Sequence, residues 1–409
     1  MAAPRPYPFV TVTEKARKSL KEGHPWVYES EILSSEGCSD GDICDVFSEK
    51  GSRWLGAGFY NSASKIRVRI VSVNTNDRFD EAFWQRRIKY AIDYRRTVMG
   101  KDFSACRLIF GEADFLPGLT VDRFGDVLST QCTCLGIDKI KEMLYSFIVE
   151  ELRRSGDSVS CLYEHKDIAL RGLEGLDVTD GEFSRVCGLG SGSGRCEITE
   201  NGVRYNVDYK NGQKTGFFLD QKYNRLAVAK IAENKRVLDC FTHTGAFALN
   251  AALAGAEYVR AVDVSKEAVE MTVANVRLNG LDGRVDCVCA DVFDMLDGML
   301  SEKKKEFDFI ILDPPAFTKS SSTIKNAMAG YRRINTAAMR LLPRGGYLAT
   351  CSCSHFMRTS LFCEMLHQSA RDAGVRLRQI EARQQSPDHP VLWSVPETDY
   401  LKFFIFQVV

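Results

Sequence analysis

The chain has 409 residues, 44% of them hydrophobic, and its 54 basic residues balance 54 acidic ones. This length and composition predict two or three globular domains, each long enough to bury a core. No apolar stretch approaches the roughly 20 residues that a membrane helix needs, and the N-terminus lacks a hydrophobic signal core, so we expect a cytoplasmic protein without a membrane partner. The 14 cysteines are too dilute for a disulfide scaffold, and we interpret nearly all of them as reduced.

The basic residues are unevenly distributed along this neutral chain. Residues 314–363 contain no acidic residue but several basic ones, and two shorter basic runs span 53–69 and 86–96. Charge runs are usually solvated surface, but a locally basic face is also what binding to phosphate requires. The candidates for phosphate contacts in the N-terminal region are Arg53, Lys65, Arg67 and Arg69, with ordinary surface charge as the alternative.

The first half of the chain predicts two small domains. Residues 9–73 read as short strands separated by glycines, with one helix over 14–22, which indicates a small β-barrel within 1–74. A charged amphipathic helix over 77–99 then opens a central domain of mixed helices and strands, 75–187. The strands expected in the first domain are 9–12, 42–47, 54–60 and 66–71.

A glycine-rich segment, 188–195, superficially matches a phosphate-binding loop. Such a loop must follow a strand and open a helix. Here the next residues carry Asn201-Gly202 between two strand-like runs, which predicts a hairpin. We therefore interpret 188–195 as a flexible linker that begins a third domain, 188–409.

From about residue 236 the chain alternates strand-like and helical stretches with short connections, a pattern typical of a doubly wound α/β sheet. Ser265 is a candidate cap for a helix over 266–278. The last strand follows a long irregular stretch rather than a helix, which leaves an antiparallel orientation open. The expected strands are 237–240, 258–264, 285–289, 307–312, 347–350, a stretch near 377–380, and 401–408.

Polar side chains at the ends of the first three strands suggest a cofactor site. The turn from Asp239 to Gly245 contains a single glycine, which suits a ligand smaller than a dinucleotide. Asp263 is placed to accept the hydroxyls of a ribose, and Asp291 to accept from the amino group of an adenine. Each acid alone is often only a cap or a turn residue, but together they indicate an adenosine without a diphosphate, as in S-adenosylmethionine.

Two further strands end in reactive groups. Asp313-Pro314-Pro315-Ala-Phe317 places a carboxylate behind a stiff turn, and Cys351-Ser-Cys353 places two thiols at the next strand end. Ligands of such sheets bind outside the carboxyl ends of the strands. The pair predicts an enzyme that alkylates a base through a cysteine nucleophile. Phe317 is a candidate to stack on a flipped base, with a core aromatic as the alternative.

Several ordered strings resemble the bacterial 5-methylcytosine methyltransferases of 23S ribosomal RNA, and the similarity covers essentially the whole chain. The strings are 214–221, 239–247, 313–317 and 352–354, with 23–27, 118–125 and 388–391 beside them. The resemblance implies an N-terminal PUA domain, a small central α/β domain and a class I (Rossmann-like) methyltransferase domain. It also implies ribosomal RNA as partner, S-adenosylmethionine as cofactor, and a plausible homodimer. A metal site at Cys351-Ser-Cys353 would lack a matching ligand pair elsewhere, so no metal is expected. Residues 214–221 are expected to close over the cofactor.

The resemblance also distributes roles among the residues. Cys353 matches the family's Ser-Cys-Ser and is the expected nucleophile, whereas Cys351 is an additional thiol that sits deeper in the strand. Asp313, Pro314, Pro315 and Phe317 are expected to receive the base. The residues expected to bind the cofactor are Phe218, Gln221, Asp239, Phe241, Thr242, Gly245, Asp263, Val264, Asp291, Val292 and Asp313.

Two roles at the site and two alternative functions stay open. Arg344 and Arg358 flank the thiols in sequence and are candidates for the positive charge that favours a thiolate. The base that removes the carbon 5 proton is not chosen, because a lone histidine such as His355 is more often structural. One alternative is methylation of an exocyclic guanine nitrogen, which also uses Asp-Pro-Pro-x-Phe. Another is an RNA-binding protein whose methyltransferase domain is only a scaffold.

Overall fold

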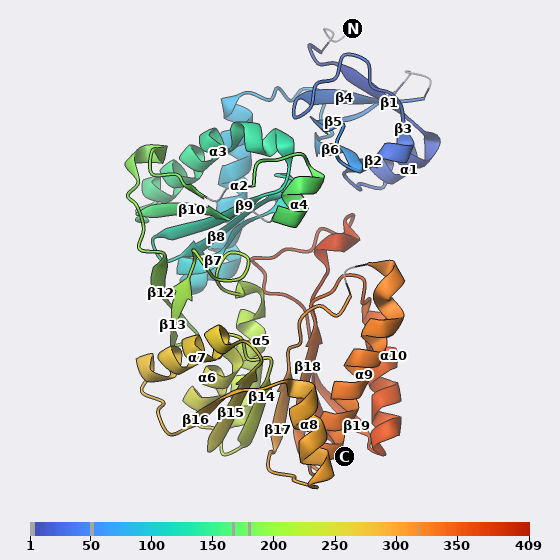
Figure 1. The fold of residues 1–409 in the computed structure, drawn as a ribbon. Helices are drawn as coiled ribbons and strands as arrows, with labels where there is room; N and C mark the ends of the chain where they lie inside the picture. Colours follow the sequence, from blue (N-terminus) through green and yellow to red (C-terminus); the bar gives the residue numbers. More distant parts are fainter. Residues whose placement is uncertain (1–4, 50–52, 166–167, 179–180, 319) are drawn as a thin grey trace. The chain divides into compact units, whose positions relative to one another are not determined.

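The computed structural model describes residues 5–49, 53–165, 168–178, 181–318 and 320–409. These residues pack as two compact units, which Figure 1 shows. The first contains the described residues within 5–198, 207–219 and 387–398, and the second contains those within 199–206, 220–386 and 399–409. The boundary expected at 188 therefore does not coincide with the division in packing, because 207–219 and 387–398 pack with the first unit.

The first unit begins with a sheet of six described strands in the order β2-β6-β5-β4-β1-β3. Its strands are β1 (Phe9–Val12), β2 (Trp26–Tyr28), β3 (Ile32–Ser34), β4 (Ile43–Ser48), β5 (Trp54–Tyr60) and β6 (Ile66–Ser72). The helix α1 (Glu14–Lys21) starts where the side chain of Thr13 accepts from the amide of Ala16. Its buried Ala16 and Leu20 join a core with Val10, Val46 and Val68.

The central part of the first unit is a second sheet, of five described strands in the order β11-β10-β9-β8-β7. A turn at Gly125 connects β8 to β9, and its φ of 67° is one that glycine adopts readily. The elements are α2 (Glu81–Met99), β7 (Ala105–Phe110), β8 (Leu119–Phe124), β9 (Val127–Cys132), α3 (Leu135–Arg154), β10 (Cys161–His165), α4 (Ile168–Leu173) and β11 (Gly181–Glu182).

The glycine-rich segment opens a strand and not a helix. It leads into β12 (Arg195–Glu200), which pairs with β13 (Val203–Asp208) around Asn201-Gly202. This confirms the predicted hairpin and excludes a phosphate-binding loop of the strand-to-helix kind. The segment is also anchored, since the amide of Gly190 donates to Ser160 O at 2.9 Å and that of Gly194 donates to Tyr209 Oη at 2.8 Å.

The second unit is built on a sheet of seven described strands in the order β16-β15-β14-β17-β18-β20-β19. The strands are β14 (Arg236–Cys240), β15 (Tyr258–Asp263), β16 (Val285–Cys289), β17 (Phe309–Leu312), β18 (Tyr347–Ser352), β19 (Leu377–Arg383) and β20 (Lys402–Val408). The first five are parallel, whereas β20 runs antiparallel to both β18 and β19. The chain reverses its direction of strand addition between β14 and β17, which is where such sheets bind ligands.

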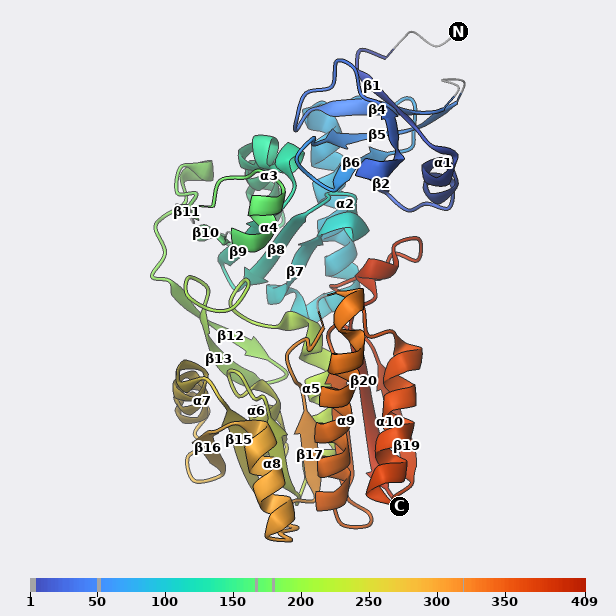
Figure 2. The same cartoon turned by 45° about the vertical axis from the view of Figure 1, so that its right-hand side comes forward.

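Two groups of helices cover this sheet. They are α5 (Lys222–Ala232), α6 (Ala246–Leu253) and α7 (Lys266–Leu278), then α8 (Val292–Ser301), α9 (Ile324–Leu341) and α10 (Thr359–Ala373). The helices α8, α9 and α10 lie side by side in both ribbon views (Figures 1 and 2). Ser265 caps α7 as expected, because its hydroxyl accepts from the amide of Ala268.

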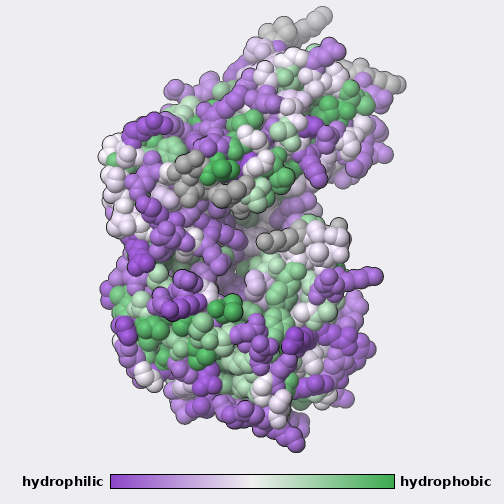
Figure 3. Space-filling model, viewed as in Figure 1, coloured by the Kyte–Doolittle hydropathy of each residue, from purple (hydrophilic) through white to green (hydrophobic). Residues whose placement is uncertain are grey.

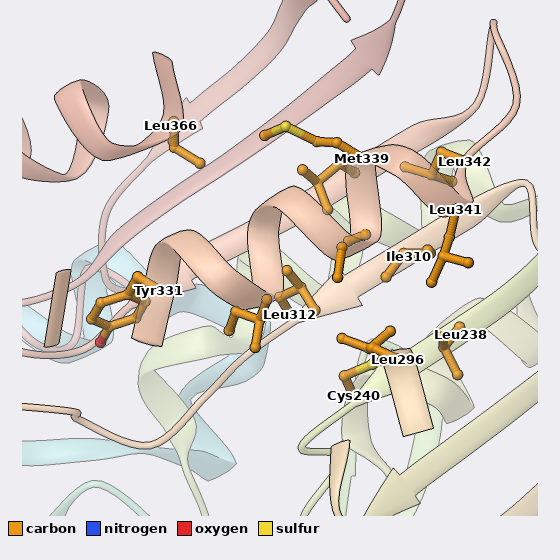
Figure 4. Close-up of a cluster of buried hydrophobic side chains, with 14 of the residues drawn as sticks. Leu238, Cys240, Leu296, Ile310, Leu312, Tyr331, Met339, Leu341, Leu342 and Leu366 are labelled. Atoms are coloured by element: carbon orange, nitrogen blue, oxygen red, sulfur yellow. The ribbon is translucent and has the colours of Figure 1, made fainter. Parts of the chain in front are cut away.

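Alternating side chains of the strands divide the core of the second unit between these two groups. Leu238, Ile310 and Phe404 join the buried cluster with α8–α10, part of which is drawn in Figure 4. Phe403, the neighbour of Phe404, instead stacks on Phe247 of α6 with ring centroids 5.9 Å apart. Successive residues of a strand point to opposite faces, so the helix groups cover opposite faces. Hydrophilic residues make up much of the visible surface of each unit, with hydrophobic patches between them (Figure 3).

Candidate active site

The turn after β14 has an unusual backbone. Phe241, His243 and Gly245 all have positive φ values, of 63°, 51° and 82°. Two of these residues are not glycine, and such strain persists only where the surrounding structure imposes it, often at a functional site. At Gly245 a Cβ would lie 2.6 Å from Thr272 Cγ2, so packing against α7 requires the glycine. The sequence related this glycine to a ligand smaller than a dinucleotide, whereas the structure gives it a role in packing.

Asp239 presents a buried oxygen that lacks a donor. Its Oδ2 accepts from Thr242 Oγ1 at 2.6 Å and from the amide of Ala248 at 3.0 Å. Its Oδ1 is buried without a hydrogen-bond partner among the described residues. Burial raises the pKa of this carboxyl to about 7. A ligand ammonium would complete the acceptor, so the site fits the amino-acid end of S-adenosylmethionine.

Two backbone amides orient the carboxylate of Asp263. Asp263 accepts from the amides of His243 at 2.9 Å and Ser265 at 3.0 Å, one on each oxygen, which orients both oxygens and leaves lone pairs for a ribose. The side chain of Val264, beside it, is 69% exposed, as an apolar surface for an adenine would be.

Asp291 is the cap of α8. Its Oδ1 accepts from the amides of Phe293 and Asp294, which is the ordinary role of a capping residue. Its Oδ2 is therefore the oxygen that would accept from a ligand. The side chain of Val292 is only 2% exposed and belongs to the core, which corrects its assignment as a cofactor contact.

Gln221 contacts Asp313 and Cys351, two of the residues at the candidate site. Its amide donates to Asp313 Oδ1 at 3.2 Å and to Cys351 Sγ at 3.5 Å, and its own Oε1 accepts from Asn224 at 2.7 Å. The sequence assigned Gln221 to the cofactor, but these contacts make it a support for Asp313. Phe218, in contrast, belongs to the first unit, where the ammonium of Lys214 lies 5.2 Å from its ring centroid.

Asp313 and Cys351 meet at the ends of β17 and β18. Leu312 is paired with Thr350, so the following residues are level with each other. The thiol of Cys351 donates to Asp313 Oδ1 at 2.9 Å. Burial raises the pKa of Asp313 to about 6, and burial followed by the Asp313 charge raises the pKa of Cys351 well above its usual range. Cys351 is therefore held as a thiol.

Cys353 lies just beyond the end of β18 and is half-buried, as a reactive cysteine needs to be. The serines on either side are anchored: Ser352 Oγ lies 2.9 Å from Tyr331 Oη, and Ser354 Oγ donates to Thr318 O at 2.8 Å. The backbone that carries Cys353 is thus fixed on both sides.

The Asp-Pro-Pro-x-Phe turn is only partly accessible. Pro314 is buried and Pro315 is exposed. Phe317 is half-buried, with its ring centroid 4.7 Å from that of Tyr331 and 6.0 Å from that of Phe293. These packed neighbours support the core alternative for Phe317.

The cation near Cys351 and Cys353 is Lys402 and not one of the two arginines that the sequence suggested. Arg344 precedes β18, at the opposite end of the strand from Cys353, and Arg358 is exposed beside the start of α10. Lys402, the first residue of β20, is instead paired with Ser352 and buried. A lysine at the start of an apolar strand was the only sequence signal for it.

The basic residues of the first unit are not equivalent. Arg69 is held between Glu112 at 3.0 Å and Glu174 at 2.9 Å, with only 12% of its side chain exposed. This argues against a phosphate contact and corrects its assignment. Arg67 is paired with Glu29, whereas Arg53 and Lys65 are exposed. In the second unit, Asp372 and Asp297 likewise neutralise two arginines of the acid-free segment, Arg332 and Arg333.

Comparisons with known proteins identify the family of this chain. A family model for S-adenosylmethionine-dependent methyltransferases matches residues 185–406, and one for PUA-like domains matches 10–73. Ribosomal RNA large subunit methyltransferase I of Citrobacter koseri is 38% identical over 395 residues, covering 96% of this chain and 97% of its own. The Klebsiella pneumoniae protein of the same name is 37% identical over 98% of this chain and 99% of its own.

The chain belongs to the ribosomal RNA large subunit methyltransferase I family. It is an S-adenosylmethionine-dependent methyltransferase with a PUA-like domain, so the scaffold alternative is not retained. A Streptococcus mutans protein described as a SAM-dependent methyltransferase has the same fold, with a TM-score of 0.82 and 22% identity over 98% of this chain and 100% of its own.

Two features are absent from the described part of this family member. No helix among the described residues is long and apolar enough to cross a membrane. No group of three or more histidine, cysteine or acidic side chains in the same part of the chain is arranged to hold a metal ion.

The raised pKa of Asp239 predicts how cofactor affinity varies with pH. An ammonium binds the carboxylate and not the acid, so affinity for S-adenosylmethionine is expected to rise between about pH 5.5 and 7.5 as Asp239 ionises near pH 7. Well below that pKa the gain is about tenfold per pH unit. Calorimetry over this range measures it. Asp239→Asn should bind more weakly and flatten the rise, whereas an identical rise in that variant would assign it to another group, such as Asp313.

Proposed function

We propose that this chain methylates carbon 5 of a cytosine in the RNA of the large ribosomal subunit, with Cys353 as the nucleophile. The observation that carries the proposal is the half-buried Cys353 on an anchored strand end, next to a strand that ends in Asp313-Pro-Pro. The similarity to ribosomal RNA large subunit methyltransferase I over nearly the whole chain supports the choice of RNA.

The chemistry requires a nucleophile because carbon 5 of cytosine is unreactive by itself. The thiolate of Cys353 adds to carbon 6, and the electrons of the 5,6 double bond make carbon 5 nucleophilic. S-adenosylmethionine, when bound, supplies an electrophilic methyl group. After transfer, a base removes the proton from carbon 5, the double bond re-forms, and the thiolate leaves. Each bond that Cys353 makes is therefore broken again within one cycle.

Asp313 is suited to hold the base during this cycle. Its carboxylate is fixed by Cys351 and Gln221, and the prolines behind it limit movement of the turn. The carboxylate accepts from the exocyclic amine of the cytosine, and the buried surroundings strengthen that hydrogen bond. The cofactor is assigned to Asp239, Asp263, the exposed Val264 and Asp291.

Identification of the methylated nucleoside tests the proposal directly. Purified protein is incubated with S-adenosylmethionine and large-subunit RNA that lacks modifications, and the RNA is then digested and analysed by mass spectrometry. We expect 5-methylcytidine at one position. A methylated guanosine would instead select the alternative, because transfer to an exocyclic nitrogen needs the Asp-Pro-Pro turn but no thiol. The homodimer expected from the resemblance stays a prediction for light scattering.

The basic residues of the first unit make a separate prediction about RNA binding. Arg53→Ala with Lys65→Ala should weaken binding and lower the salt dependence by roughly one unit of slope for each phosphate that the variant no longer binds. Arg69→Met should leave the salt slope unchanged but destabilise the fold by about 3–5 kcal/mol, because two partly buried carboxylates lose their partner. Filter binding at several salt concentrations and thermal unfolding separate these outcomes; a reduced slope in Arg69→Met would restore it as a phosphate contact.

A further inference from the structure

Lys402 places a cation inside the active-site end of the second unit. Its side chain is 3% exposed, and lysine is rarely buried so completely unless it is paired. Its ammonium donates to two carbonyl oxygens, of Ser354 at 2.6 Å and of Tyr400 at 2.8 Å. Neither acceptor carries a charge that would compensate for burying an ammonium, so the fold keeps this cation here at a cost.

The contacts of Lys402 converge on the strand end that carries Cys353. Ser354, whose carbonyl it binds, directly follows Cys353, and Ser352, with which it pairs across the strands, directly precedes it. An ammonium has three donors, and the two carbonyls use two of them. The third remains for an acceptor within the site.

Charged and titratable groups around Lys402 are few. On its own segment Asp399 acts on the ammonium, and from β18 the two thiols Cys351 and Cys353 do so. On α9, Tyr331 contacts Ser352, and its phenol is kept neutral by burial. Burial lowers the pKa of Lys402 to about 8, although negative charge on Asp399 and on the nearby sulfur atoms acts in the opposite direction. Such an interaction is mutual, because a thiolate that stabilises the ammonium is stabilised by it to the same extent.

Only one of the two thiols can use this charge. Cys351 is buried and donates to Asp313, and the charge of that carboxylate opposes ionisation of the thiol. Cys353 lies beyond the strand and is half-buried. We propose that Lys402 is a positioning residue whose buried ammonium favours the thiolate of Cys353 and holds the backbone that carries it. This inference rests on the proposed role of Cys353 as nucleophile.

The test follows alkylation of Cys353 by iodoacetamide as a function of pH, in the full chain, with mass spectrometry of the peptide to separate it from the other cysteines. Lys402→Gln keeps hydrogen-bond donors but removes the charge, Lys402→Arg keeps the charge, and Lys402→Met removes both. We expect the pH midpoint of alkylation to rise by about one unit or more in the Gln and Met variants. In the same variants kcat at neutral pH should fall by at least roughly tenfold, because less of Cys353 is ionised. Lys402→Arg should stay near the wild-type midpoint.

Lys230→Met, on the exposed face of α5, is the matched control for loss of one positive charge from the same unit and should change neither quantity. An unchanged midpoint in Lys402→Gln would overturn the inference and leave Lys402 a structural residue. If Lys402→Met does not fold, the Gln and Arg pair still decides. The proposed function is tested separately by Cys353→Ala. If that variant is active, Cys353 is not the nucleophile, whatever the alkylation midpoints of the Lys402 variants are. If it is inactive but the Lys402 variants keep the wild-type midpoint, only the role of Lys402 is wrong.

Discussion

Replacing Cys353 by alanine is expected to reduce methyl transfer by roughly a thousandfold or more, because removing a covalent nucleophile leaves only the contributions of binding and orientation. The side chain is half-buried and its flanking serines are anchored by Tyr331 and Thr318, so the substitution should leave the fold intact. Methylation of unmodified large-subunit RNA measures the loss. RNA that contains 5-fluorocytosine should form a stable covalent adduct with the wild-type protein and none with the variant.

Cys351→Ser is the matched control for this experiment. A serine hydroxyl can still donate to Asp313 from the same position, so activity is expected to stay within roughly tenfold of wild type. If Cys351→Ser is inactive while Cys353→Ala is active, the nucleophile is Cys351. If both variants are active, the cysteine mechanism is wrong and methylation of a guanine nitrogen becomes the better hypothesis.

Asp313→Asn is expected to lower kcat by roughly 10²–10³-fold, the range for loss of one preorganised hydrogen-bonding group in a buried site. Burial raises the pKa of this carboxyl to about 6. Wild-type activity should therefore fall as the pH drops below about 6, because the carboxylate becomes protonated. The variant cannot ionise and should lack this acid limb. Single-turnover rates between about pH 5 and 8 measure both effects.

An asparagine can accept from Cys351 as the aspartate does, so the contact with Cys351 remains available in this variant and a melting temperature close to wild type is expected. A wild-type kcat would contradict the role of Asp313. An acid limb that persists in Asp313→Asn would assign the pH dependence to another group, of which Asp239, with its pKa near 7, is the first candidate.

Local pattern was sufficient for the elements of the fold. Strands such as Trp54–Tyr60 and Val285–Cys289, and the helix Lys266–Leu278, begin and end where the sequence predicts. Their apolar residues, caps and glycines act within a few positions of each other, so the information is local. The alternation from residue 236 also predicted the doubly wound sheet, and the irregular stretch before β20 indicated that this strand could be antiparallel, as it is.

The sequence predicted poorly which basic residues are free to bind phosphate. Residues 314–363 are basic when read alone, but Asp372 and Asp297 lie opposite two of their arginines. Arg69 looked like a surface cation beside Arg67, yet Glu112 and Glu174, distant in sequence, enclose it. Electrostatic partners depend on distance in space, and a sequence window contains only the partners on the same segment.

The sequence by itself determined that an adenosine-binding sheet ends in a carboxylate turn and a pair of thiols. The order of short motifs along successive strands is enough for this, because parallel strands bring their carboxyl ends to one edge. Only the tertiary structure decided how the thiols differ. Cys351 is placed against Asp313 and kept protonated, whereas Cys353 is left at the strand end near the buried ammonium of Lys402. Burial and the charge of neighbours set the ionisation of a thiol, and both arise when β20 inserts beside β18.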